Sequence, residues 1–298
     1  MKDYNDVIIQ IEALKLYFEK LDTQQAIKKN ILRNSLLKSA RFSSKIEGAD
    51  SKLEIDNLYK AYLYVTSKKS PQKLSLNLLK ELHKIVLNNI SSDSGQFRTY
   101  PCAIYNTAGV AIYLAPPAQK INELLNNLIK EINDSQEHCL IKAAIFQFKF
   151  EKIHPFLDGN GRIGRLVSYL MLYKNSFSFN GYLSPEEYIN KYREIYYDCL
   201  DSDKNYQPFI KFFLESILNQ IRTTFNDLKN PSNLNHLLPR RREIYEIIKD
   251  HPNCSFDFIN RRFIKINPKT LHYDLSQLQK ENLIMKAGVS RGTTYVIK

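Results

Sequence analysis

The fold of this chain is decided by one stretch, His154-Pro155-Phe156-Leu157-Asp158-Gly159-Asn160-Gly161-Arg162-Ile163-Gly164-Arg165. Apolar residues at helical spacing lie on both sides of it, over residues 140–148 and 166–172. A glycine-rich turn between two such patterns is typical of a tight loop that opens a buried helix. We therefore predict a loop at the start of this stretch and a helix that begins near Arg162.

The groups around the start of this predicted helix are suited to hold an anion. A helix N-terminus has unpaired N–H groups and a partial positive charge. Gly159 and Gly161 allow the backbone to approach phosphate oxygens closely. Arg162 and Arg165 are three residues apart, so they share one face of the first turn, where each can make forked hydrogen bonds to phosphate. The stretch therefore predicts a phosphate site.

Two further side chains of the stretch add reactive chemistry. Asp158 offers the hard oxygen ligand that Mg²⁺ takes beside phosphates. His154 has an ordinary pKa near neutrality, so it suits the general base for a substrate hydroxyl. Together these groups indicate phosphoryl or nucleotidyl transfer. Taken singly they support a plainer interpretation, because Asp-Gly-Asn-Gly is a common turn and a lone histidine is more often structural.

The order of these residue types resembles the signature of Fic-domain proteins, His-x-Phe-x-Asp/Glu-Gly-Asn-Gly-Arg-x-x-Arg, and every specified position is filled. The resemblance implies transfer of AMP from Mg-ATP to a hydroxyl of a target protein, a reaction called AMPylation. The target could include the protein itself. The Asp-Gly-Asn-Gly-Arg form resembles that of the AMP-transferring members, whereas the kinase-like branch departs from it around Gly-Arg.

The resemblance also implies a role for each residue of the signature. By this likeness His154 deprotonates the target hydroxyl and Asp158 holds Mg²⁺, while the two arginines hold the region of the β- and γ-phosphates. The predicted nucleotide-binding residues of the signature are Gly159, Asn160, Gly161, Arg162, Ile163, Gly164 and Arg165.

A second motif, Ser43-Ser44-Lys45-Ile46-Glu47-Gly48, predicts the end of a helix at a glycine cap. An acid at this end opposes the helix dipole unless it has a partner, and a solvated Glu47 is the plain interpretation. Ser-x-x-x-Glu-Gly resembles the inhibitory motif of Fic proteins, in the class whose inhibitory helix precedes the core. The resemblance implies that Ser43 and Glu47 are inhibitory, and that Glu47 pairs with Arg165 and blocks productive ATP binding. Removal of AMP by the same site is an alternative that the sequence leaves open.

Residues 100–117 form two short β-prone runs about a turn, which predict a small hairpin. The hairpin follows Gly95-Gln96-Phe97-Arg98 and resembles the Fic "flap" that docks the target segment by strand-like pairing. The predicted docking residues are Ile104, Tyr105, Ile112 and Tyr113. An ordinary surface hairpin is the alternative.

Tyr196 and Tyr197 resemble a Tyr-Tyr element that helps to line the nucleotide pocket of Fic proteins. They are therefore predicted nucleotide-binding residues on the adenosine side, although aromatic residues at helical spacing are usually core residues. Ser184 and Pro185, with Glu187 three residues after the serine, predict the N-cap of the helix that carries them.

Composition limits the broad class. The 298 residues are 43% hydrophobic, and nine Gly and eleven Pro argue against a loop-rich all-β fold. No apolar run reaches membrane-spanning length, so we expect a cytoplasmic protein without membrane contact. Four scattered cysteines suggest reduced thiols and no zinc site. The net charge of +12 suits a polyanionic or acidic partner.

We predict a mainly α-helical fold, a Fic helical-bundle core with a β-hairpin flap and a C-terminal winged-helix domain. The predicted parts are N-terminal helices including the inhibitory helix at 1–70, the catalytic core at 71–228, a linker at 229–238 and a winged helix-turn-helix at 239–298. The end of the chain also resembles winged-helix domains attached to many bacterial Fic proteins.

The predicted winged helix carries 12 Lys and Arg against 6 Asp and Glu. This excess favours DNA, but the expected recognition helix at residues 268–280 lacks the Arg, Asn and Gln set that reads bases well. Docking of a protein and self-association into a homodimer are equally open. The competing function is a DNA-binding regulator whose Fic core serves as a nucleotide sensor.

Overall fold

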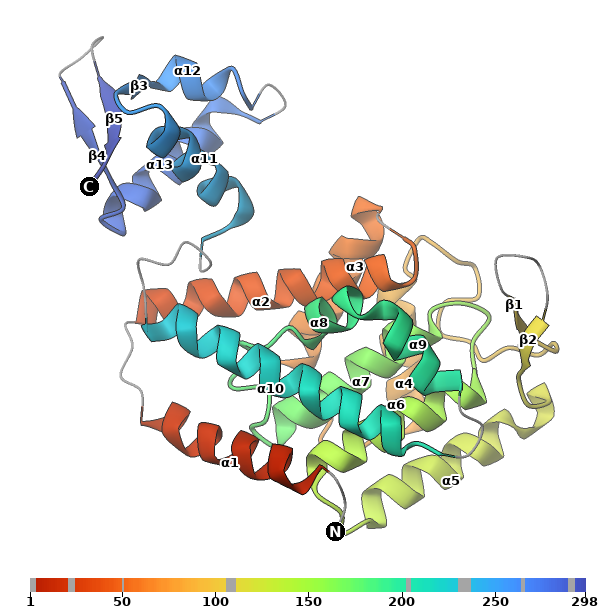
Figure 1. The fold of residues 1–298 in the computed structure, drawn as a ribbon. Helices are drawn as coiled ribbons and strands as arrows, with labels where there is room; N and C mark the ends of the chain where they lie inside the picture. Colours follow the sequence, from red (N-terminus) through yellow and green to blue (C-terminus); the bar gives the residue numbers. More distant parts are fainter. Residues whose placement is uncertain are drawn as a thin grey trace. The chain divides into compact units, whose positions relative to one another are not determined.

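The structure is a computed structural model that describes residues 4–20, 25–49, 51–105, 111–201, 205–229, 237–263, 266–288 and 293–298 (Figure 1). The side chains at 25–27, 104–105, 111–112, 227 and 229 lie outside this description. The chain divides into two compact units, one of residues 1–22 and 35–225 and one of residues 23–34 and 226–298. The fold is mainly helical, as predicted. None of the helices in the described ranges is long and apolar enough to cross a membrane.

The first unit is built from helices with one small hairpin. Its described elements, two of which continue into the second unit, are α1 (Asn5–Glu19), α2 (Gln25–Ile46), α3 (Lys52–Val65), α4 (Leu76–Val86), β1 (Ala103–Tyr105), β2 (Ala111–Leu114), η1 (Ala118–Lys120), α5 (Ile121–Asp134), α6 (Cys139–Ile153), α7 (Asn160–Lys174), α8 (Pro185–Lys191), α9 (Arg193–Asp201) and α10 (Gln207–Lys229).

Helix α7 lies at the centre of this unit, because its residues are buried on nearly every side. It packs along α6, and Gly164 permits the close approach. A Cβ at this glycine would lie 3.2 Å from Glu151 Oε1 and 3.5 Å from Phe150 Cδ1. The apolar residues of α6 and α10, among them Phe148, Phe209 and Ile217, form a core on the other side of α6. The stretch from 154 to 165 is thus held on two packed helices.

The predicted helix start at Ser184 is only partly right. Ser184 precedes α8 and Pro185 takes the first helical position, but the serine hydroxyl makes no capping hydrogen bond in the described structure. The helix also ends at Lys191 and a new one starts at Arg193. Tyr192 lies between them with ψ of 42°, which the α conformation does not allow.

The predicted hairpin is present as strands β1 and β2, which pair antiparallel with Ile104 opposite Tyr113. Residues 106–110, at its tip, lie outside the described residues, as do the side chains of the predicted docking residues Ile104, Tyr105 and Ile112. The Tyr113 hydroxyl donates to the backbone carbonyl of Lys152. This contact joins the hairpin to the last turn of α6.

The second unit contains the remaining elements: α11 (Pro239–Asp250), β3 (Cys254–Ser255), α12 (Phe256–Asn260), α13 (Pro268–Lys280), β4 (Ile284–Ala287) and β5 (Thr294–Ile297). Its strands form an antiparallel sheet in the order β3-β5-β4. Ile244, Leu271 and Leu275 are in its core. Helix α13 lies where the recognition helix is expected from the sequence, at residues 268–280. Of the predicted linker at 229–238, residues 230–236 lie outside the described residues.

Candidate active site

His154 stands at the end of α6 in a left-handed backbone conformation, with φ of 50°. Such a conformation is strained for a residue with a side chain, and strain of this kind is concentrated at functional sites. Burial lowers the pKa of His154, so its imidazole is neutral and can accept a proton near neutral pH. The predicted base is therefore in the protonation state that a base requires.

Arg98 holds the turn that carries His154. Its buried guanidinium donates to the backbone carbonyls of His154 at 2.7 Å, Tyr100 at 2.9 Å and Pro116 at 2.6 Å. Tyr100 and Pro116 flank the hairpin, so one side chain ties both ends of the hairpin to the His154 turn. Arg98 belongs to the Gly-x-Phe-Arg motif, but its role was not predicted, because its partners are carbonyls distant in sequence.

The loop after His154 is closed by Asn160. The Phe156 N–H donates to Asn160 Oδ1 and Asn160 Nδ2 donates to the Phe156 carbonyl, both at 2.9 Å. Gly159 has φ of 81°, a conformation that favours glycine. The side chain of Asn160 is thus engaged by the loop.

His83, on α4, supports the same loop and was missed by sequence reasoning. Its Nδ1 accepts from the Gly95 N–H at 2.8 Å, so the ring proton is on Nε2, which donates to the Asp158 carbonyl at 3.0 Å. The ring stacks on Phe156 with centroids 3.7 Å apart. Burial lowers the pKa of His83, which keeps this neutral form. A polar residue on the apolar face of the α4 pattern was the available signal.

The remaining predicted residues of the signature lie in the first turns of α7. The Ile163 side chain is in the core, and Gly164 contacts α6, so neither presents a side chain to a ligand. Gly161 borders the carboxylate of Glu47: a Cβ added there would overlap Glu47 Oε1. An anion therefore already lies against the start of α7, and it belongs to the chain itself.

Arg165 is buried and binds the end of α2. Its Nη2 donates to Glu47 Oε1 at 2.7 Å and to the Ser43 carbonyl at 2.9 Å, while Nε donates to Ser43 Oγ at 3.1 Å. Burial by itself lowers the pKa of Arg165, but the charge of Glu47 raises it above its ordinary value. Arg165 stays charged, and the predicted contact with Glu47 is present in this structure.

Glu47 reaches Arg165 because α2 ends immediately before it. The helix stops at Ile46, and Gly48 follows with φ of 77°, in the conformation of a glycine cap. The Ala49 N–H donates to the Ser44 carbonyl at 3.2 Å, which closes the turn. The glutamate therefore projects from the end of the helix toward α7.

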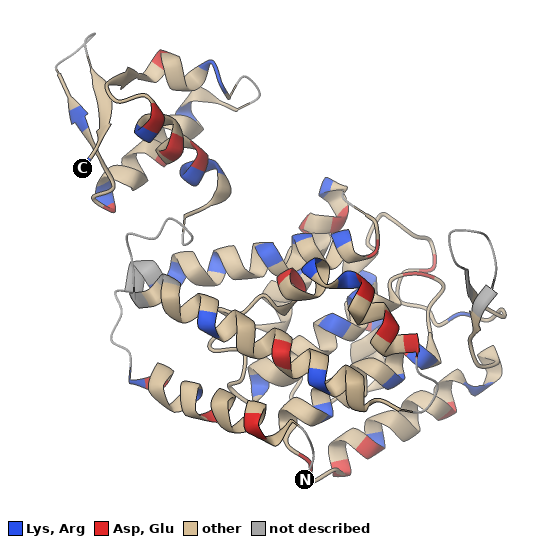
Figure 2. Cartoon of the chain, in the orientation of Figure 1, with Lys and Arg blue, Asp and Glu red and all other residues tan. Residues whose placement is uncertain are grey.

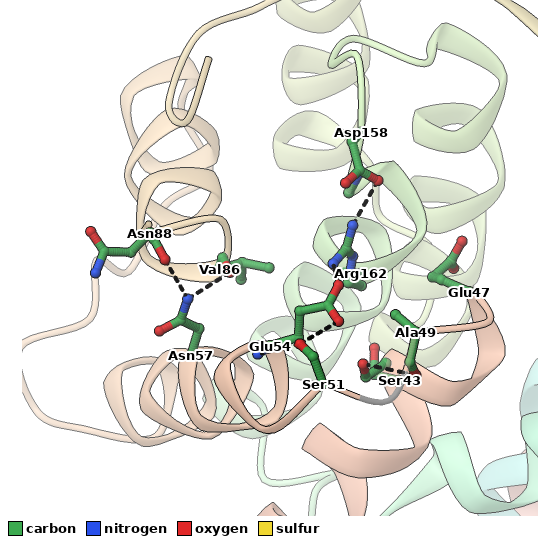
Figure 3. Close-up of polar contacts among 12 residues, drawn as sticks. Ser43, Glu47, Ala49, Ser51, Glu54, Asn57, Val86, Asn88, Asp158 and Arg162 are labelled. Carbon is green, nitrogen blue, oxygen red and sulfur yellow. Dashed lines mark hydrogen bonds and ion pairs between the residues drawn. The ribbon is translucent and has the colours of Figure 1, made fainter. Parts of the chain in front are cut away.

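Arg162 lies between two other carboxylates, as Figure 3 shows. Its Nη1 donates to Glu54 Oε1 at 2.9 Å and its Nη2 donates to Asp158 Oδ1 at 2.6 Å. The Arg162 side chain is 3% exposed, whereas that of Asp158 is 62% exposed. Glu54 was not predicted, because nothing local in its sequence points to Arg162.

Asp158 fits Mg²⁺ only as one ligand among several. No three His, Cys, Asp or Glu side chains gather into a metal-binding group in the described part of the chain. Mg²⁺ beside a nucleotide commonly takes one or two carboxylates, with phosphates and waters as the other ligands. The exposed carboxylate of Asp158, beside the start of α7, suits that arrangement.

The two predicted tyrosines contact Arg165 and the end of α2. Tyr196 is in the core, and its hydroxyl accepts from Gln147 Nε2 at 3.1 Å and from Arg165 Nη1 at 3.4 Å. Tyr197 is partly exposed, and its hydroxyl donates to the Ile46 carbonyl at 3.2 Å. Their predicted place on the adenosine side stays a prediction.

A further acid, Glu151, lies behind Arg165 and Gly164. Burial, with a smaller contribution from the charge of Glu47, raises the pKa of Glu151 to about 8. The side chain is therefore largely protonated at neutral pH. Sequence reasoning gave no role to this residue, which lies one turn before His154.

The chain is similar in sequence to a known protein family. A sequence profile of the Fic/DOC family matches residues 73–172. Protein adenylyltransferase Fic of Aedes aegypti is 27% identical over 161 residues, which are 52% of this chain and 30% of that protein. A probable protein adenylyltransferase of Aquifex aeolicus is 33% identical over 85 residues, 28% of this chain and 27% of that protein. The matches thus span less than a third of either relative.

A solved structure shares the fold over nearly the whole chain. The crystal structure of a Fic family protein from Desulfovibrio desulfuricans G20 superimposes with a TM-score of 0.63. The superposition covers 98% of this chain and 95% of that chain at 21% sequence identity. At this identity the likeness concerns the fold alone, and function must be argued from the site.

Proposed function

Because this chain is a Fic-domain protein, with its Fic/DOC family domain at residues 73–172, we propose that it is an autoinhibited protein adenylyltransferase. It moves AMP from Mg-ATP to a Tyr, Thr or Ser hydroxyl of a target protein, which could be a copy of itself. The names of the two curated relatives support the reaction class. The identity of the target stays open, and the cytoplasmic location stays a prediction.

The observation that carries this proposal is the position of the Glu47 carboxylate. It lies against Gly161 at the start of α7 and accepts from Arg165 at 2.7 Å. A helix N-terminus with a buried arginine is a binding place for an anion. The chain's own carboxylate occupies part of that place, beside the loop that begins at the predicted base.

The site residues divide the reaction among them. His154 accepts the proton of the target hydroxyl as its oxygen bonds to the α-phosphorus, and the bond from that phosphorus to pyrophosphate breaks. The N–H groups at the start of α7 and the two arginines, Arg162 and Arg165, hold the phosphates. Asp158 would hold Mg²⁺, which supplies neutralisation of the charge on the departing pyrophosphate.

Inhibition follows because the Glu47 carboxylate and a phosphate of ATP are both negatively charged and would compete for the same place. The Glu47 carboxylate occupies Arg165 and would repel a phosphate that approached the same helix start. ATP can then bind in the orientation that permits transfer only when Glu47 no longer contacts Arg165. The alternative activity, removal of AMP from the target, uses the same carboxylate. Glu47 is then required for the removal of AMP and opposes its transfer.

The test is incubation of the protein, alone and in cell lysate, with ATP radiolabelled at the α-phosphate. We expect the Glu47→Gly chain to leave much more label on protein than the parent chain, and we expect His154→Ala in the Glu47→Gly chain to abolish it. ATP labelled at the γ-phosphate is the matched control and should leave no label. Equal labelling by parent and Glu47→Gly chains would contradict autoinhibition, and absence of label in both would contradict the transferase.

We further propose that the second unit is the predicted winged helix, whose order of helices and strands supports this interpretation. Its basic residues give DNA binding less support. Arg240 and Arg241 donate to the buried Asp274, the latter at 3.0 Å, so their charge is used within the unit. Figure 2 also shows acidic and basic segments following one another along α11. Docking of a protein or of a second copy therefore fits better than duplex DNA.

A further inference from the structure

The Arg162 guanidinium is shared between one helix and one loop. Its Nη1 donates to Glu54 Oε1, on α3, at 2.9 Å, and its Nη2 donates to Asp158 Oδ1, in the loop before α7, at 2.6 Å (Figure 3). A buried arginine requires such partners, and Arg162 is 3% exposed. Asp158 is the predicted Mg²⁺ ligand, which leaves Glu54 as a carboxylate without a role in the reaction described so far.

The carboxylate of Glu54 is fixed by the start of its own helix. Ser51 is the N-cap of α3, and its Oγ accepts from the Glu54 N–H at 3.2 Å. The same hydroxyl donates to Glu54 Oε2 at 2.7 Å. The serine hydroxyl thus caps the helix and also holds Oε2 of Glu54, while the other carboxylate oxygen, Oε1, accepts from Arg162.

Helix α3 is in turn anchored to the body of the first unit. Asn57, one turn after Glu54, donates from Nδ2 to the carbonyls of Asn88 at 2.8 Å and Val86 at 3.3 Å (Figure 3). Leu58, Ala61 and Tyr62 are fully buried. Glu54 is therefore presented from a packed helix, whereas Glu47 stands in the turn where α2 has already ended.

We propose that Glu54 is a positioning residue, which holds Nη1 of the Arg162 guanidinium so that only Nη2 bonds Asp158 and one oxygen of the Asp158 carboxylate stays available to the Mg²⁺ of Mg-ATP. The inference rests on the proposed function and deepens it. An arginine with both edges free tends to bind a neighbouring carboxylate through two parallel hydrogen bonds. With Nη1 held by Glu54, Asp158 receives a single bond from Arg162, which leaves its other oxygen for a metal ion.

The decisive variant is Glu54→Gln in the Glu47→Gly chain, because glutamine keeps the size of the side chain and can still bond Ser51. We expect kcat/KM for ATP to fall about tenfold, mainly through a higher KM and a higher Mg²⁺ requirement, with kcat nearly unchanged. Titration with Mg-ATP should show the same loss of affinity. Asp56→Asn removes an equal charge from the exposed side of α3 and should change neither quantity.

Each other result decides against the positioning role. Unchanged dependence on ATP and Mg²⁺ would show that Arg162 needs no second carboxylate. A gain of labelling by Glu54→Gln in the chain that retains Glu47 would make Glu54 a second inhibitory acid. A lower kcat at constant KM, with a lower unfolding temperature, would indicate a structural role alone.

The titration separates this inference from the function on which it rests. A Glu47→Gly chain that binds Mg-ATP but labels no protein would contradict the transferase. The Glu54→Gln titration would then still support or overturn the positioning role. A Glu47→Gly chain that binds no Mg-ATP would overturn both.

Discussion

Arg98 donates from Nε to the backbone carbonyl of His154 across 2.7 Å, and this bond joins the predicted base to the flanks of a hairpin far from it in sequence. The other nitrogens of Arg98 bind the carbonyls of Tyr100 and Pro116 on the two sides of that hairpin. The proposed target-docking strand and the proposed base are therefore positioned by the same guanidinium.

We predict that Arg98→Lys lowers both stability and transfer. Lysine keeps the charge but cannot reach three carbonyls with a planar fork, so buried acceptors lose their partners, at a cost of about 2 kcal/mol. In the Glu47→Gly chain, labelling of a target should fall more than Mg-ATP affinity does. Denaturant unfolding and nucleotide titration measure the two effects. Arg222→Lys, on the exposed side of α10, is the control, and a fully active Arg98→Lys chain would refute the prediction.

Removal of Glu47, the proposed inhibitory acid, should itself cost stability. Glu47→Gly leaves Arg165 buried without its nearest carboxylate, and loss of one partner of a buried pair costs about 3 kcal/mol. Without nucleotide, the Glu47→Gly chain should therefore unfold at a lower temperature than the parent. Mg-ATP should raise that temperature more in the variant than in the parent, because phosphate replaces the lost charge. A variant as stable as its parent in the absence of nucleotide would argue against a tight Glu47–Arg165 pair.

Glu151 predicts a pH dependence of stability with a definite sign. Its pKa is raised from 4.5 to about 8 in the folded chain, so the folded state holds the proton more tightly than the unfolded state. Its contribution to the free energy of unfolding is favourable below about pH 4.5 and declines as the pH rises toward about 8. Glu151→Gln should remove this decline, which amounts to roughly 3 kcal/mol at about pH 7.

The measurement for Glu151 is the free energy of unfolding of parent and Glu151→Gln chains over this pH range. The difference between the two should grow steadily in favour of the variant as the pH rises. Glu194→Gln, on the exposed side of α9, serves as the charge-matched control. A difference that stays constant with pH would contradict the raised pKa.

The pH dependence of transfer should report the imidazole of His154. Burial lowers its pKa below the ordinary value of 6.5, so the base loses its function only at a more acid pH. In the Glu47→Gly chain the acid limb of kcat/KM should therefore lie below pH 6.5. Removal of Glu47 should lower that limb further, because its charge favours the protonated ring. An acid limb clearly above this value would be incompatible with His154 as the base.

The parts of the site that sequence could predict are those whose partners are close in the chain. His154, Asp158 and Gly159 are recognisable by their order alone, and the glycine conformation at 159 follows from the turn. The start of α13 was predictable for the same reason, because Asn267 caps it through the Lys269 N–H two residues away. The roles of these residues in catalysis stay predictions.

The remaining supports join residues that are far apart in sequence. Glu54 reaches Arg162 across 108 positions, and His83 reaches the Asp158 carbonyl across 75. Both bonds depend on how α3 and α4 pack against α7, which no local pattern records. Strand β3 escaped prediction for a similar reason, because two residues form a strand only where β5 lies beside them. Packing therefore determines these contacts.

Gly161 has a consequence for how this site could change in evolution. The same bare backbone gives room to the Glu47 carboxylate and to any phosphate at the start of α7. A larger residue at this position would expel the carboxylate but also narrow the space left for the nucleotide. A mutation at position 47 could therefore remove the proposed autoinhibition and leave the nucleotide site intact. A larger residue at position 161 could not, because it would also obstruct the nucleotide.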